Sequence, residues 1–219
     1  MYLIELAGAV ILAYLAGSLN TAILVSRIVG GEDIRTLGNR NPGTTNIGRT
    51  LGRGWAAAVF FGDVGKAVVP MVIAERLFFS AETAAGMAAL TSMGMSAMLG
   101  HIKPIYFHFK GGGGLATTLG VIAFFVPFEL VLSMLIGFPL GMLFFKNKKY
   151  KLGRWVAMLI ILMNPAICLL TTVLLDISVA GRIKIGGHPW RLLIAVTVLV
   201  AFIVLINIKT VLHPAHEKR

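Results

Sequence analysis

Seven apolar runs, separated by short polar segments, restrict this chain to a membrane fold. A helix needs about 20 apolar residues to span a bilayer, and most of these runs are close to that length. The mean hydropathy is +0.86 and only 13% of the residues are charged, whereas an ordinary soluble domain carries about 25% charge. The expected spans cover approximately residues 2–29, 55–79, 83–100, 119–126, 128–145, 155–175 and 189–207.

These runs predict an all-α, polytopic membrane protein with about seven transmembrane helices, folded as a single integral membrane domain over residues 1–219. The start of the chain does not resemble a cleavable signal peptide, because residues 1–6 contain Glu5 and no basic residue. The one cysteine, Cys168, lies inside an apolar run. We therefore expect neither a disulfide nor a metal framework, and no cofactor.

The net charge of +11 comes from short basic clusters between the apolar runs. This pattern suits anionic lipid head groups or a phosphorylated substrate better than duplex DNA, so we expect no nucleic-acid partner. Basic residues favour the cytoplasmic side of a membrane. With the N-terminus outside, fifteen of the twenty Lys and Arg are cytoplasmic, including the basic turn at 146–154, and a polar loop at 182–188 is outside. Both glycine-rich polar segments and the C-terminus are then cytoplasmic.

The longest polar segment, Gly31–Gly54, contains four arginines among six glycines. Asn41-Pro42 is typical of a helix start, with asparagine as the cap and proline at the first position. A short helix from Pro42 would place Arg49 and Arg53 four residues apart on one face. Backbone amides, a helix N-terminus and guanidinium groups together suit a phosphate or a carboxylate. The alternative is a basic loop of the kind common at the cytoplasmic edge of membrane proteins.

A second polar segment, His101–Thr118, contains four consecutive glycines after Lys110. Glycine amides that lead into a helix can form an anion-binding nest, with Lys110 supplying charge. A flexible turn before a span explains the glycines as well, and this is no P-loop, because no GK[ST] follows. His101 suits a base, a phosphate donor or a histidine that is only hydrogen-bonded. The sequence contains no Ser-His-Asp order, no HExxH motif and no paired carboxylates. A reaction that needs a strong base is therefore poorly supported.

The spacing of the polar and small residues inside the spans indicates structural roles for them. Asp63 and Lys66 lie three residues apart on one helix face, so this pair can neutralise itself. Gly137 and Gly141 have the GxxxG spacing of close helix packing. A transporter would carry polar residues near the midplane of several helices. Because only Asp63 and Lys66 lie deep here, transport is the least favoured function.

Several motifs together resemble the PlsY family of membrane acyltransferases. They are Gly17-Ser18 with Arg27, NPGTTNIGR from Asn41, DVGK from Asp63, and GHIKPIYFHFKGG from Gly100. The resemblance implies seven transmembrane helices in the bacterial plasma (inner) membrane, with the motifs facing the cytoplasm. It also implies transfer of an acyl chain from acyl phosphate to the 1-hydroxyl of glycerol 3-phosphate, which gives lysophosphatidate for phospholipid synthesis. The implied partners are these two substrates and membrane lipids.

An acyl phosphate is already activated, so such a site mainly aligns two substrates and neutralises their phosphates. Arg35, Arg49 and Lys110 suit this neutralisation. The resemblance implies no metal site, and implies catalytic roles for Arg49, His101 and Asn207. It implies substrate binding by Arg27, Arg35, Asn39, Asn41, Thr45, Asn46, Lys110, Gly111, Gly112 and Gly114.

The sequence departs from the family pattern at several motif positions. Asn39 stands where the family has a serine, Arg40 where it has a glycine, and Gly113 where it has a phosphate-binding lysine. Of the closing motif, which has an arginine-histidine pair before Asn-Ile, only the Asn-Ile at Asn207 is left. Arg40 or Lys151 would be able to restore the lost charge. The alternative function is a degenerate family member that binds acyl phosphate or lipid without turnover.

Overall fold

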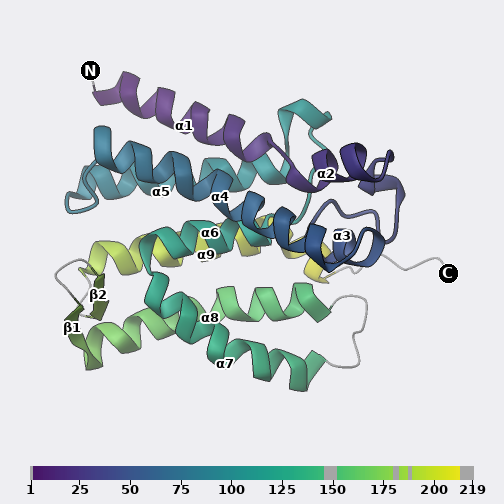
Figure 1. Ribbon diagram of the computed structural model, residues 1–219. Coiled ribbons are helices and arrows are strands. Elements are labelled where there is room, and N and C mark those ends of the chain that lie inside the picture. The colour runs from purple at the N-terminus through teal and green to yellow at the C-terminus, as the bar shows by residue number, and fades with distance from the viewer. Residues whose placement is uncertain (1, 146–151, 180–182, 187–188, 213–219) are drawn as a thin grey trace.

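The computed structural model describes residues 2–145, 152–179, 183–186 and 189–212. Long helices lie side by side along a common direction, which confirms the predicted all-α fold (Figure 1). The helices are α1 (Tyr2–Ser18), α2 (Thr21–Val29), α3 (Thr44–Thr50), α4 (Arg53–Leu77), α5 (Ala84–Ile102), α6 (Leu115–Phe125), α7 (Pro127–Phe145), α8 (Leu152–Leu174) and α9 (Trp190–Leu212), with short 3-10 turns η1 (Ile34–Thr36) and η2 (Ile105–Phe107).

The predicted polar loop before the last span is instead a β-hairpin. Strand β1 (Asp176–Val179) pairs antiparallel with β2 (Ile183–Gly186), with Ile177 opposite Ile185. Both strands alternate polar and branched apolar residues in the sequence, which is the period of a strand. Four residues are too few for that alternation to stand out beside the long apolar runs, so the hairpin was missed.

Within the described residues, five segments are long and apolar enough to cross a membrane: α1 with α2, α4, α7, α8 and α9. The other two predicted spans also form helices, but α5 is rich in small and polar residues and α6 has only 11 residues. Most residues of both helices are buried in the bundle. A helix surrounded by other helices needs no continuous lipid-facing surface, and this accounts for their composition.

The first apolar run divides into two helices at its predicted break. Asn20 caps α2, and its side chain accepts a hydrogen bond from the N–H of Ile23. Gly17, just before the break, lets α1 approach α5 closely, because an added Cβ would overlap the carbonyl of Ala97. Helix α1 therefore ends where it crosses α5, and the polar chain continues from that crossing.

The GxxxG pair of α7 packs against α8. A Cβ added to Gly137 would lie 2.8 Å from Ile160 Cγ1, and one added to Gly141 would lie 2.7 Å from Val156 Cγ2. Both distances are below ordinary van der Waals contact, so only glycine allows this approach. The predicted packing role of the pair is confirmed.

Inside the first polar segment, the predicted helix starts later and ends sooner. Gly43 is extended, and α3 runs only from Thr44 to Thr50. Gly52 has a φ of +99°, a conformation that favours glycine, and the chain turns there. Arg53 therefore opens α4. The prediction that Arg49 and Arg53 share a helix face is wrong, because this turn separates them.

Both polar segments lie at one end of the bundle (Figure 1). α2, η1 and α3 gather there beside the end of α5, whereas the start of α1 and the β-hairpin lie at the opposite end. This arrangement agrees with the predicted placement of both segments on one side of the membrane. Outside the described residues lie most of the basic turn (146–151), Arg182, His188 and the tail (213–219).

We expect Gly17→Ala to lower the thermal unfolding midpoint of the detergent-purified protein, because the new methyl group meets a backbone carbonyl of α5. Overpacking of this kind destabilises a fold by about 1–3 kcal/mol. Gly8→Ala is the matched control, since nothing lies within 4 Å of an added Cβ at this position of the same helix. Equal midpoints for the two variants would contradict the close crossing of α1 and α5.

Candidate active site

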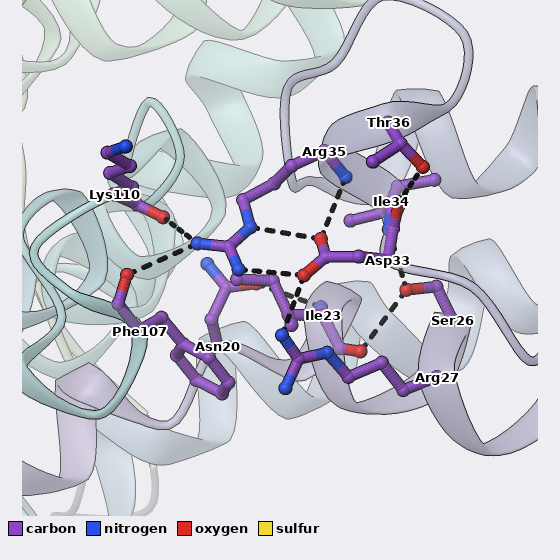
Figure 2. Close-up of polar contacts among 10 residues, drawn as sticks. All are labelled: Asn20, Ile23, Ser26, Arg27, Asp33, Ile34, Arg35, Thr36, Phe107 and Lys110. Carbon is purple, nitrogen blue, oxygen red and sulfur yellow. Dashed lines mark hydrogen bonds and ion pairs between the residues drawn. The ribbon is translucent and has the colours of Figure 1, made fainter.

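Asp33 holds two of the arginines that were predicted to bind substrate (Figure 2). Arg35 donates to it from Nε at 2.9 Å and from Nη2 at 2.7 Å, and Arg27 donates from Nη2 at 2.8 Å. Arg35 Nη1 also donates to the carbonyls of Phe107 at 3.2 Å and Lys110 at 3.1 Å. This Asp33 clamp ties the first polar segment to the second.

The Asp33 clamp is ionised near neutral pH. Hydrogen bonds from Arg35, and then from Arg27, hold the pKa of Asp33 well below its usual range, and the carboxylate raises the pKa of Arg35. A lowered carboxyl pKa stabilises the fold above the usual titration range, and this contribution is lost only as the pH falls toward the lowered value. The contacts of Arg27 and Arg35 favour a role in joining the segments over direct phosphate binding.

The amide of Asn46 shapes the first polar segment from inside. Its Oδ1 accepts from the N–H of Asn39 at 3.1 Å, and its Nδ2 donates to the carbonyls of Ile34 at 3.3 Å and Leu37 at 3.0 Å. The side chain of Asn39 accepts from the N–H of Asn41 at 3.1 Å. Of these predicted binding residues, Asn46 is buried and Asn39 and Asn41 are exposed, so Asn46 supports the loop that presents the other two.

Lys66 of α4 joins three helices below the polar segments. Its Nζ donates to Asp63 Oδ1 at 2.8 Å and to the carbonyl of Leu19 at 3.0 Å, and lies 2.7 Å from Nδ1 of His101. The predicted neutralisation of Lys66 by Asp63 is confirmed. The contact with His101 adds a connection to the predicted site that sequence spacing did not reveal.

With Lys66 protonated, its contact with His101 determines which ring nitrogen of His101 carries the proton. An ammonium group only donates, so Nδ1 of His101 accepts and the ring proton is on Nε2. Asp63 Oδ1 lies 3.6 Å from Nδ1, too far for a hydrogen bond. Nε2 faces the glycine loop (residues 111–114), since a Cβ added to Gly112 would lie 2.6 Å from it.

The Nε2–H of His101 faces the glycine loop with no acceptor among the described residues. The side chain is only 3% exposed, and no residue in the described ranges accepts a hydrogen bond from Nε2. Nε2 is not one of the described side-chain atoms that are fully buried without a hydrogen-bond partner, so it is not closed off from a small molecule outside the chain. The position of this donor, against the glycine loop, therefore marks the place where a ligand oxygen would lie.

The glycine loop folds back along the end of α5. The N–H of Gly111 donates to the carbonyl of Ile102, and the N–H of Gly112 donates to the carbonyl of His101, both at 3.2 Å. The predicted nest of amides thereby narrows to Gly113 and Gly114, whose N–H groups have no acceptor in the part of the chain that the structure describes. They lead directly into the N-terminus of α6, which favours an anion.

Asn207 of α9 brackets the glycine loop from the other side. Its Nδ2 donates to the carbonyls of Gly113 at 3.1 Å and Ile203 at 3.0 Å, and its Oδ1 accepts from Arg154 Nη2 at 3.2 Å. Both amide hydrogens of Asn207 are thus used by the protein. The geometry favours a role in positioning the loop over the predicted catalytic one.

The remaining predicted residues lie at the surface of this end. Arg49, Asn41, Thr45 and Lys110 are exposed. Thr45 lies against the start of α8, where a Cβ added to Gly153 would be 3.0 Å from its Oγ1. The structure therefore brings α3, the glycine loop and the first turn of α8 together. Among the residues that the structure describes, no group of His, Cys, Asp and Glu could hold a metal.

The sequence matches the family profile described as "Glycerol-3-phosphate acyltransferase" over residues 7–214. The chain belongs to the glycerol-3-phosphate acyltransferase family. One curated family member, from Shewanella woodyi, is 39% identical over 168 residues, which cover 77% of this chain and 71% of that protein. Another, from Azotobacter vinelandii, is 43% identical over 117 residues, which cover 53% of this chain and 59% of that protein.

The fold of this chain is similar to two crystal structures of PlsY, an integral membrane glycerol 3-phosphate acyltransferase. The glycerol 3-phosphate form matches with a TM-score of 0.72 and 27% identity, covering 95% of this chain and 91% of that chain. The lysophosphatidic acid form matches with a TM-score of 0.68 and 25% identity over the same shares. The predicted PlsY family, the multi-pass membrane fold and, at the level of the family, the membrane acyltransferase are confirmed.

The structure shows the surroundings of two positions, 40 and 113, at which the sequence departs from the family pattern. Arg40, where the family pattern has glycine, keeps a left-handed backbone with a φ of 60°, which costs a non-glycine residue about 1–2 kcal/mol. Arg154, the last residue of the predicted basic turn, donates to the same Asn207 oxygen that a side chain at Gly113 would meet, and the family pattern has lysine at Gly113. No local motif indicated this contact, because it joins residues 53 positions apart.

Proposed function

We propose that this chain transfers an acyl chain from acyl phosphate to the 1-hydroxyl of glycerol 3-phosphate. The hydroxyl oxygen attacks the acyl carbon, the bond from that carbon to the phosphate oxygen breaks, and phosphate leaves with the electron pair. The products are lysophosphatidate and inorganic phosphate. The observation that carries the proposal is the Nε2–H of the His101 side chain, which faces the glycine loop without an acceptor among the described residues.

His101 acts as a hydrogen-bond donor in this mechanism. With the Lys66 ammonium 2.7 Å from Nδ1, the imidazole offers its remaining proton from Nε2 and offers no free lone pair to the substrates. A fixed donor stabilises an anionic oxygen most when its charge grows in the transition state. The hydroxyl proton of glycerol 3-phosphate passes to a phosphate oxygen of the substrates, which bring their own base.

Cations at the shared end of the bundle would neutralise the two phosphates. Arg49 and Lys110 are exposed there and keep their predicted role in the proposal. The Asp33 clamp, Asn46 and Asn207 hold the two polar segments in register around the glycine loop. Alignment and charge neutralisation are the main requirements when the acyl donor is already activated.

The proposal places the reaction at the cytoplasmic face of a bacterial plasma membrane, within one domain over the whole chain. The N-terminus would be outside, and the C-terminus and both polar segments inside. Solved forms of PlsY with glycerol 3-phosphate and with lysophosphatidic acid support the substrate and the product proposed here. The fatty chain would lie between apolar helices at the bilayer edge, where exposed leucines and phenylalanines are abundant.

Purified protein in detergent, given acyl phosphate and glycerol 3-phosphate, is expected to release phosphate and lysophosphatidate in equal amounts. His101→Ala should lower kcat by about 100-fold or more, the usual effect of removing a donor to a developing oxyanion. His101→Gln should retain a measurable part of that activity, because its amide N–H can replace Nε2–H although it cannot act as a base. Thermal unfolding of each variant checks that the fold is intact.

Two outcomes would contradict this account. Absence of turnover in the native protein with acyl phosphates of any chain length would overturn the reaction and favour a family member that binds without turnover. Equal and complete loss in folded His101→Gln and His101→Ala would overturn the donor role and favour a base.

The orientation is tested by cysteine labelling in intact cells, in a Cys168→Ala background. Thr36→Cys, in the first polar segment, should resist an impermeant thiol reagent, because that segment is expected to face the cytoplasm. Ser80→Cys, exposed between α4 and α5 at the opposite end, should be labelled and is the positive control. Labelling of Thr36→Cys with protection of Ser80→Cys would reverse the orientation.

A further inference from the structure

We propose that Arg154 is the cation that binds a substrate phosphate at the glycine loop of this chain. The identity of the substrates rests on the proposed function, but phosphate binding by Arg154 can be measured without turnover. Arg154 lies in the first turn of α8, directly after Leu152-Gly153, which is what this chain keeps of a family motif with a serine before leucine-glycine.

Among the described residues, the surroundings of Arg154 contain a hydrogen-bond partner and no counterion. Its side chain is half-buried, and Nη2 donates to Asn207 Oδ1 at 3.2 Å. No carboxylate in the described ranges forms an ion pair with it. A guanidinium carries five N–H donors, so most of them remain for another acceptor. A partly buried cation without a counterion is unfavourable unless an anion binds beside it.

The contact with Asn207 places the guanidinium at the glycine loop. Asn207 Oδ1, which accepts from Arg154, is also the nearest atom to a Cβ added at Gly113, at 3.6 Å. A side chain at position 113 would therefore start toward the same place that Arg154 reaches from α8. The backbone of Gly113 is outside the left-handed region, and 3.6 Å is ordinary contact, so a side chain fits there.

Donors of three kinds converge on this part of the loop. The N–H groups of Gly113 and Gly114 have no acceptor among the described residues, and α6 begins at the next residue. The Nε2–H of His101 faces the neighbouring Gly112. A guanidinium beside free amides at a helix N-terminus matches the charge and the donor pattern of a phosphate monoester.

This geometry assigns the missing lysine charge to Arg154 in place of the two residues first considered. Arg40 is exposed in the first polar segment, on a left-handed turn. Lys151 lies outside the described residues. Arg154 is connected to residue 113 through one intervening amide, that of Asn207, so it can supply positive charge close to where a lysine at 113 would.

The test compares Arg154→Ala, Arg154→Gln and the double variant Gly113→Lys with Arg154→Ala. Both single variants should raise KM about tenfold or more, as expected when one charge-assisted hydrogen bond is lost. Separate KM values for glycerol 3-phosphate and for acyl phosphate show which phosphate is bound. The double variant should regain at least part of the loss, because the new lysine starts from the same side of the loop.

Binding is measured separately, as the rise in unfolding temperature of the detergent-purified protein with inorganic phosphate. The native protein should be stabilised, Arg154→Ala and Arg154→Gln should lose this response, and the double variant should recover it. Arg191→Ala is the matched control: this exposed arginine is in the first turn of α9, at the opposite end of the bundle, and its removal should leave the response unchanged.

An unchanged phosphate response and unchanged KM values in folded Arg154→Gln would overturn the proposal. So would a loss that Gly113→Lys does not reverse, since a purely structural role through Asn207 would not depend on charge at position 113. If the native protein shows no turnover, the proposed reaction fails, while the phosphate response still decides whether Arg154 binds an anion.

Discussion

The site depends on the hydrogen bonds made by the ammonium group of Lys66. A charge inside a membrane protein is tolerated only when it is paired and hydrogen-bonded. Lys66 meets this condition with the Asp63 carboxylate, the Leu19 carbonyl at the end of α1, and His101 at the end of α5. The same contacts that satisfy the charge therefore hold α1, α4 and α5 together and direct the proton of His101 toward the glycine loop.

Hydrogen bonds around Lys66 join the two polar segments and leave N–H donors directed at the glycine loop. Arg35 ties the first segment to the carbonyls of Phe107 and Lys110, and Asn207 ties α9 to the carbonyl of Gly113. These hydrogen bonds use backbone carbonyls as acceptors. The N–H groups of Gly113, Gly114 and His101 have no acceptor among the described residues and can donate to a ligand. Among the described residues, this end of the bundle is rich in N–H donors and cations, and such a site suits the proposed reaction between two phosphorylated molecules, in which the acyl group arrives activated.

The parts of this structure that follow local rules were predictable from the sequence. Apolar runs gave the helices, and the spacing of Gly137 and Gly141 gave the packing of α7 on α8. Long-range pairing was not predictable, because nothing in the local pattern shows that Asp33 would occupy the arginines or that Arg154 would reach the loop. Glu129 also escaped notice within an apolar run, although it is fully buried and accepts from Thr171 of α8 at 3.1 Å.

The protonation pattern of His101 tests the central claim most directly. Protein labelled with ¹⁵N-histidine can be compared with His101→Gln, which identifies the His101 signals by their loss. The account predicts an unprotonated, hydrogen-bonded Nδ1 and a protonated Nε2 near neutral pH, and loss of this pattern in Lys66→Met, which removes the donor to Nδ1. A native His101 protonated on Nδ1, or on both nitrogens, would contradict the account.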